Sequence, residues 1–69
     1  MVEVFKTNVE SSMQAELLLV LLQNHLPFTE IHFDLEDCDN VLRVKGDGFC
    51  PVTIIQIMEA RGFECCVLD

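Results

Sequence analysis

Apolar and polar residues alternate over short stretches near the middle of the chain. In residues 31–35, three apolar side chains alternate with His32 and Asp34, which is typical of a strand with one buried face. Residues 41–45 repeat the alternation, with two apolar side chains expected to point inward. Residues 36–40 between them are polar and rich in turn-forming types. The pattern predicts two strands joined by a hairpin turn.

Two further strands are expected near the ends of the chain. Residues 2–7 alternate, and we expect Val2 and Val4 to face the core, with Phe5 on the other side. Residues 63–68 follow a glycine and are largely apolar, so they are expected to form the last strand. The chain therefore has four predicted strands, two in each half.

Two helices are predicted between these strands. Ser11 precedes Gln14 by three residues, the spacing of a capping box, so a helix is expected from there until Pro27 stops it. A second helix is expected to begin at Pro51, because the first helical position needs no backbone N–H donor. Gly62 is the natural stop for this helix, since glycine readily adopts the left-handed conformation that ends many helices.

The order of these elements predicts the fold. Two β-α-β units with right-handed crossovers, joined by a hairpin, form a ferredoxin-like βαββαβ sandwich of the α+β class. Residues 1–69 are expected to form one domain, with a four-stranded antiparallel sheet and two helices on one face. The other face is expected to be open to solvent and to carry Glu3, Phe5, His32, Asp34, Arg43, Lys45, Glu64 and Cys66.

The first helix is apolar on two sides. At ~100° per residue, one stripe suits contact with the sheet, and it consists of Ala15, Leu18, Leu19, Leu22 and Leu26. Met13, Leu17 and Val20 form a second stripe on the opposite side, with the spacing of a helix–helix contact. One interpretation is a docking surface for another protein or for a second copy of this chain. The other is that a small domain simply exposes a few apolar residues.

Charge and composition narrow the choice of partner and compartment. Twelve acidic and four basic residues give a formal net charge of −8, which disfavours nucleic acids and anionic membrane surfaces. The first ten residues lack the pattern of a signal peptide, and the longest apolar run, residues 17–22, is too short to span a bilayer. We therefore expect a cytoplasmic protein whose four cysteines are reduced.

Three segments resemble one known family. The opening VEVFKTN, the hairpin IHFDLEDCDNVLRV and the ending MEARGFECCVL are similar to heavy-metal-associated (HMA) domains, such as copper chaperones and modules of metal-pumping ATPases. The resemblance covers essentially the whole chain and implies the same fold. In that family a C-x-x-C pair after the first strand binds Cu(I) or Zn(II) through two thiolates. Here the corresponding positions fall near Val9 and Ser12, so the motif is missing.

The four cysteines stand elsewhere in the sequence. Cys65 and Cys66 are adjacent in a predicted strand and should point to opposite faces, with Cys65 in the core. Cys50 precedes the second helix, whereas Cys38 lies in the hairpin turn at the same end as the family's metal loop. Cys38 is therefore the one candidate ligand for copper or zinc. The alternative is that all four are small apolar side chains without a ligand.

Signals of catalysis are absent from the sequence. There is no glycine-rich phosphate loop, no nucleophile elbow and no recognisable pairing of cysteine with histidine, so we expect no enzyme and no catalytic residue. The favoured hypothesis is a degenerate HMA-like module without a cofactor, which acts through protein–protein contact or as a homodimer. The alternative is a soft-metal binding or chaperone domain that uses ligands outside the family motif.

Overall fold

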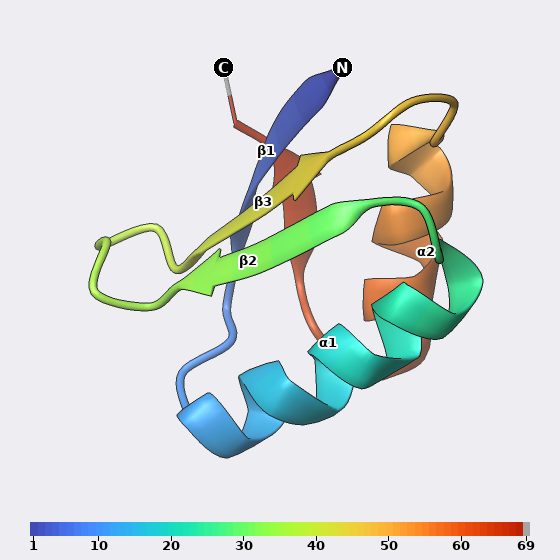
Figure 1. Cartoon of the computed structure of the whole chain (residues 1–69). Helices are drawn as coiled ribbons and strands as arrows, with labels where there is room; N and C mark the ends of the chain where they lie inside the picture. Colours follow the sequence, from blue (N-terminus) through green and yellow to red (C-terminus); the bar gives the residue numbers. More distant parts are fainter. Residues whose placement is uncertain (69) are drawn as a thin grey trace.

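The computed structural model describes residues 1–68 and shows six elements in the predicted order. They are β1 (Val2–Thr7), α1 (Ser12–His25), β2 (Glu30–Asp34), β3 (Val41–Lys45), α2 (Pro51–Ala60) and β4 (Cys65–Val67). The strands form one antiparallel sheet in the order β2-β3-β1-β4, and both helices cover the same face (Figure 1). The ferredoxin-like α+β fold is therefore confirmed.

The helix starts follow the predicted chemistry. The hydroxyl of Ser11 accepts a hydrogen bond from the backbone N–H of Gln14 at 3.1 Å, which caps α1. The Gln14 side chain accepts from the N–H of Glu10 at 3.4 Å, one residue earlier than a standard capping box requires. α1 ends before Pro27, and α2 begins at Pro51, as expected.

The end of α2 determines where the last strand begins. Gly62 has a φ of +85°, and its N–H bonds the carbonyl of Glu59 at 2.9 Å. The N–H of Phe63 bonds the carbonyl of Met58 at 3.1 Å, which completes a Schellman motif. Because Phe63 belongs to this motif, β4 begins only at Cys65, two residues later than the sequence predicts.

The two faces of β1 are the reverse of the prediction. Phe5 was expected on the open face, but it is 0% exposed and lies opposite Leu42 in the sheet ladder. Glu3 lies two residues before Phe5, so it points to the same helix-covered face, where it is half-buried. Val2 points to the other face and is 54% exposed. Each face of this strand carries apolar residues, Val2 and Val4 on one and Phe5 on the other. Phe5 has the larger apolar surface, so the orientation that buries Phe5 is the more favourable one.

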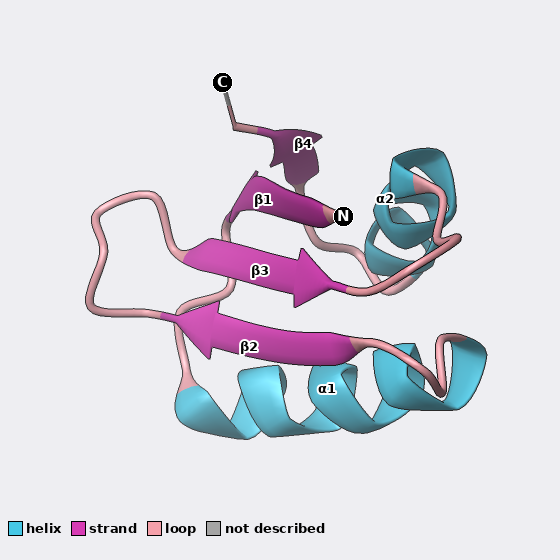
Figure 2. Cartoon of the chain, turned by 45° about the horizontal axis from the view of Figure 1, so that its top comes forward, coloured by secondary structure: helices cyan, strands magenta, loops and turns pink. Residues whose placement is uncertain are grey.

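The core lies between the sheet and the two helices, whose positions beside the sheet are shown in Figure 2. α1 contributes Ala15, Leu18 and Leu22, and α2 contributes Ile54 and Met58. The inner stripe predicted for α1 is therefore confirmed. The other residues predicted for the open sheet face are all exposed: His32, Asp34, Arg43, Lys45, Glu64 and Cys66.

Candidate functional site

The loop between β1 and α1 is where the resemblance places two metal-binding thiols. Val9, at the first of these positions, is 0% exposed and belongs to the hydrophobic core. Ser12, at the second, is the exposed first residue of α1. An isopropyl group buried in the core offers no donor atom to a cation, so these two positions do not fit the family's soft metal ion.

Thr7 closes this loop against the hairpin turn. Its hydroxyl donates a hydrogen bond to the carbonyl of Asn40 and accepts one from the N–H of Val9 at 3.2 Å. Its own N–H bonds the carbonyl of Asp39 at 3.1 Å. Asn40 adopts a φ of 48°, which asparagine tolerates better than most residues and which turns its carbonyl toward β1. The loop and the hairpin turn therefore form one hydrogen-bonded rim.

Replacing Thr7 by valine should destabilise the domain by about 2 kcal/mol, because it leaves two partly buried backbone groups without partners. Thr7→Ser keeps the hydroxyl and should lose less. Urea unfolding followed by circular dichroism measures both values. If Thr7→Val were as stable as the parent, the hydroxyl would not be what holds the loop against the turn.

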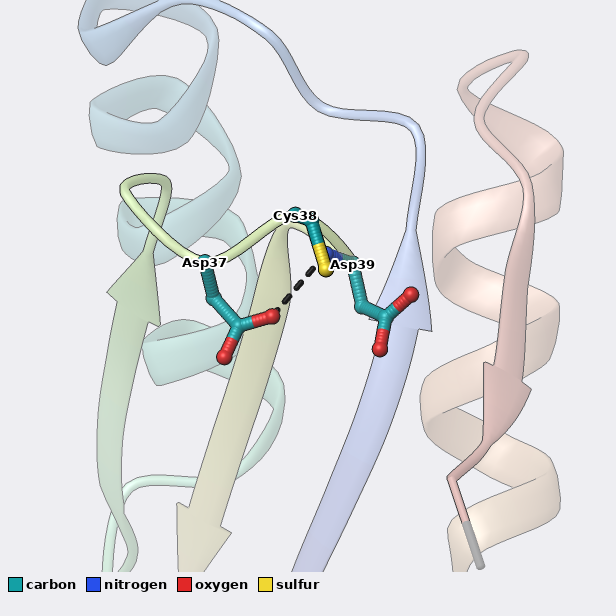
Figure 3. Close-up of side chains that lie close together, drawn as sticks. All are labelled: Asp37, Cys38 and Asp39. Atoms are coloured by element: carbon teal, nitrogen blue, oxygen red, sulfur yellow. Dashed lines mark hydrogen bonds between the residues drawn. The ribbon is translucent and has the colours of Figure 1, made fainter.

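Cys38 lies in the hairpin turn between two aspartates. The thiol of Cys38 and the carboxylates of Asp37 and Asp39 have potential ligand atoms within 4.8 Å of one another (Figure 3). Both carboxylates already have partners: Asp37 accepts from the N–H of Asp39 at 2.9 Å, and Asp39 lies 3.9 Å from the ammonium of Lys6. A mixed set with one soft ligand is less suited to copper or zinc than paired thiolates.

Cys65 and Cys66 lie on β4, beside Thr7 and Lys6 of β1, and are not part of this group of ligand atoms. Cys65 is buried and faces the helices, whereas Cys66 is exposed on the opposite face of β4, as alternation predicts. Burial raises the pKa of the Cys65 thiol to about 12, with smaller contributions from the charges of Cys66 and Glu59. Cys65 is thus an inert core thiol at neutral pH.

Cys50 occupies the N-cap position of α2 and is exposed. No side-chain hydrogen bond caps the helix, but the backbone N–H groups of Thr53 and Val52 favour the thiolate and lower the pKa of Cys50. The start of α2, where Cys50 is the N-cap residue, lies at the opposite end of the domain from the hairpin turn between β2 and β3 (Figure 1). The four thiols are therefore not gathered into one cluster.

The Cys65 thiol makes stability depend on alkaline pH. The pKa of this thiol in the folded protein is about 12, above the ordinary value of 9.0. The contribution of the neutral thiol to the free energy of unfolding is therefore fully present below pH 9. The free energy of unfolding should therefore fall as the pH rises from 9 towards 12. Urea unfolding at pH 8 and at pH 10.5 measures the fall, and Cys65→Ala should show a smaller one. If the free energy of unfolding fell equally in the parent and in Cys65→Ala, the pH dependence would not come from the Cys65 thiol.

The outer side of α1 is the most apolar exposed part of the helices. Met13, Leu17 and Val20 are 72%, 69% and 63% exposed, and they lie where the sequence pattern puts them. None of the three is among the core residues or the residues packed against the core. The structure therefore leaves this stripe uncovered.

Beside the stripe, α1 and the connection from α2 to β4 enclose a groove, called here the α1 groove, with a volume of about 480 Å³. Its walls are mainly apolar and consist of Leu17, Leu18, Val20, Leu21 and Phe63. Its polar lining consists of Gln14, Asn24 and Arg61. Arg61 is the C-cap residue of α2 and is exposed.

Sequence reasoning missed two parts of this surface. Phe63 and Arg61 flank Gly62 in the Schellman motif, and both line the groove beside α1. The Arg-Gly-Phe sequence after a predicted helix was the available signal. Phe28, which follows α1, is 92% exposed and was not singled out either. It lines a separate small pocket near the end of α1 rather than the groove.

The two histidines do not form a catalytic arrangement with another side chain in residues 1–68. The Nδ1 atom of His25 lies 3.4 Å from the carbonyl oxygen of Leu21 at the end of α1, and His32 lies opposite Arg43 in the sheet.

Within residues 1–68, no helix has the length and apolar character needed to cross a membrane. No protein-family model, curated protein or solved structure matches the chain.

Proposed function

We propose that the domain is a non-enzymatic binding module, related to HMA domains but without their thiolate site, that acts through protein–protein contact on the outer side of α1. The observation that carries the proposal is the exposure of Met13, Leu17 and Val20 at helix–helix spacing. The inner side of the same helix is already covered by the sheet. A helix that is apolar on both sides needs a second partner to remove its outer stripe from water.

The energetics favour such a contact. Full burial of one aliphatic side chain contributes about 1.5–3 kcal/mol, so three neighbouring side chains offer a substantial part of a micromolar affinity. Binding needs little ordering of the backbone, because the three residues already lie on a regular helix. The entropy lost on binding is correspondingly small. A net charge of −8 further favours a protein partner over nucleic acid or an anionic membrane.

Leu17→Glu tests this proposal, with Val52→Glu as the matched control. Val52 is 56% exposed on α2 and is not part of the α1 groove, so the control adds the same charge elsewhere. Proteins captured by the parent should be lost with Leu17→Glu and retained with Val52→Glu. A partner that is retained equally by both variants would contradict the proposal.

Self-association is one form of the same proposal. Light scattering over a concentration series should detect a dimer that Leu17→Glu dissociates. A protein that stays strictly monomeric at high concentration, with Leu17→Glu behaving identically, removes the homodimer and leaves contact with another protein.

A second candidate function is copper or zinc binding at the hairpin turn, with Cys38 as the soft ligand. The approach of the Asp37, Cys38 and Asp39 ligand atoms within 4.8 Å favours it. The buried Val9 and the engaged carboxylates weigh against it. The two candidates differ in one variant, because Cys38→Ser should abolish metal uptake and leave contact through α1 unchanged.

A further inference from the structure

Building on the proposed function, we propose that the α1 groove binds an amphipathic helical segment of another protein, and that Arg61 selects segments with a carboxylate at the edge of their apolar face. The groove has one wall from a 14-residue helix and another from Phe63. The lining of α1 runs from Gln14 to Asn24, which at ~1.5 Å per residue is a wall of roughly 15 Å. A groove of this kind suits the apolar ridge of a bound helix, with anchors spaced by three and four residues.

The size of the surface favours a short segment over a second copy of the chain. One aliphatic side chain has roughly 100 Å² of apolar area, and Met13, Leu17 and Val20 are 72%, 69% and 63% exposed, so the stripe offers roughly 200 Å². A stable dimer buries about 800 Å² on each partner. Two copies would also bring together a charge of −16, since each carries −8. A peptide helix needs less area and adds less repulsion.

Arg61 is the charged group that lines the groove. Within residues 1–68, no carboxylate lies within salt-bridge distance of its guanidinium; the one ion pair found there joins Lys6 and Asp39. The Schellman motif fixes the Arg61 backbone beside the apolar wall. A guanidinium presents paired N–H donors that match a carboxylate, and at the border of an apolar surface that pairing is strengthened.

The negative net charge of the domain does not cancel this local preference. Exposed charges farther than about 8 Å away are largely screened at physiological ionic strength. Among residues 1–68, no acidic side chain lines the α1 groove, and Gln14 and Asn24 offer only neutral hydrogen-bonding groups. The partner is therefore expected to be apolar along one face with a single acidic side chain at its border.

A displayed library of 14-residue helical peptides tests the inference. The library varies the apolar face and its flanks, and it is selected on the reduced parent protein. Selected peptides should share apolar positions three and four apart, with Asp or Glu at a fixed border position. Synthetic peptides with that residue as Glu should bind roughly 5- to 10-fold more tightly than their Gln counterparts, as measured by fluorescence anisotropy.

Arg61→Gln should remove this difference and leave the binding of the Gln peptides unchanged. Leu17→Glu should abolish binding of both, and Val52→Glu should change neither. Circular dichroism confirms that each variant is folded, as expected for substitutions at exposed positions.

The outcomes separate this inference from the function on which it rests. Peptides that need Leu17 but show no preference for an acidic residue overturn the role of Arg61 and leave the docking surface in place. The same holds if Arg61→Gln preserves the preference. If selection gives no peptide that Leu17→Glu rejects, the inference is wrong, and the proposed function is then decided by the capture and light-scattering experiments.

Discussion

Replacing Phe5 by alanine should destabilise the domain by about 3–5 kcal/mol, the largest effect expected from a single substitution here. The Phe5 ring is fully buried, lies opposite Leu42 and belongs to the core that both helices cover. Its loss removes apolar contacts and leaves a cavity that the surrounding side chains fill only in part. Urea unfolding gives the change in the free energy of unfolding. A domain of this size is only marginally stable, so a loss of this magnitude is a large part of the total.

Val4→Ala is the control, because the adjacent residue faces the other side of the sheet and is only half-buried. It should cost about 1 kcal/mol or less. If Phe5→Ala leaves too little folded protein to measure, Phe5→Leu should still lower the unfolding midpoint more than Val4→Ala does. A larger loss for Val4→Ala would mean that β1 has the opposite face inward, as the alternation alone suggests.

Replacing Val9 by serine should cost about 2–4 kcal/mol, because it removes buried methyl groups and places a hydroxyl in the core. Val9 occupies the first position that the HMA resemblance assigns to a metal-binding thiol, yet it is 0% exposed. The substitution therefore measures how much the packing of the Val9 side chain contributes to stability. Thermal and urea unfolding should both show the loss.

Ser12→Ala is the matched control at the second of these positions. Ser12 is exposed and does not cap α1, so its replacement should change stability by about 0.5 kcal/mol or less. If Val9→Ser and Ser12→Ala were equally harmless, the loop would be open at Val9. The contrast between a core position and a solvent-exposed one would then be lost.

The element order was predictable because each helix boundary has a local chemical signal. Ser11 caps α1 through its own hydroxyl, Pro51 is compatible with the first position of α2, and Gly62 adopts the positive φ that ends α2. The inner and outer sides of α1 followed from helical periodicity. These features depend on residues close together in the sequence, so no tertiary contact was needed to find them.

The face of β1 and the α1 groove were not predictable in the same way. β1 is apolar on both faces, and its orientation depends on the size of Phe5 and on the Thr7 hydroxyl, which bonds a residue 33 positions away. The groove requires Arg61 and Phe63 to approach α1, and this depends on how the α2–β4 connection packs. Periodicity carries no information about either arrangement.

Native mass spectrometry of the reduced protein with one equivalent of Cu(I) or Zn(II) is the sharpest single test, because it reports metal stoichiometry and oligomeric state together. A module that acts through the outer side of α1 should retain no tightly bound ion, and Cys38→Ser should give the same spectrum. A one-to-one metal complex of the parent that disappears in Cys38→Ser would contradict this and would establish the hairpin turn as a metal site.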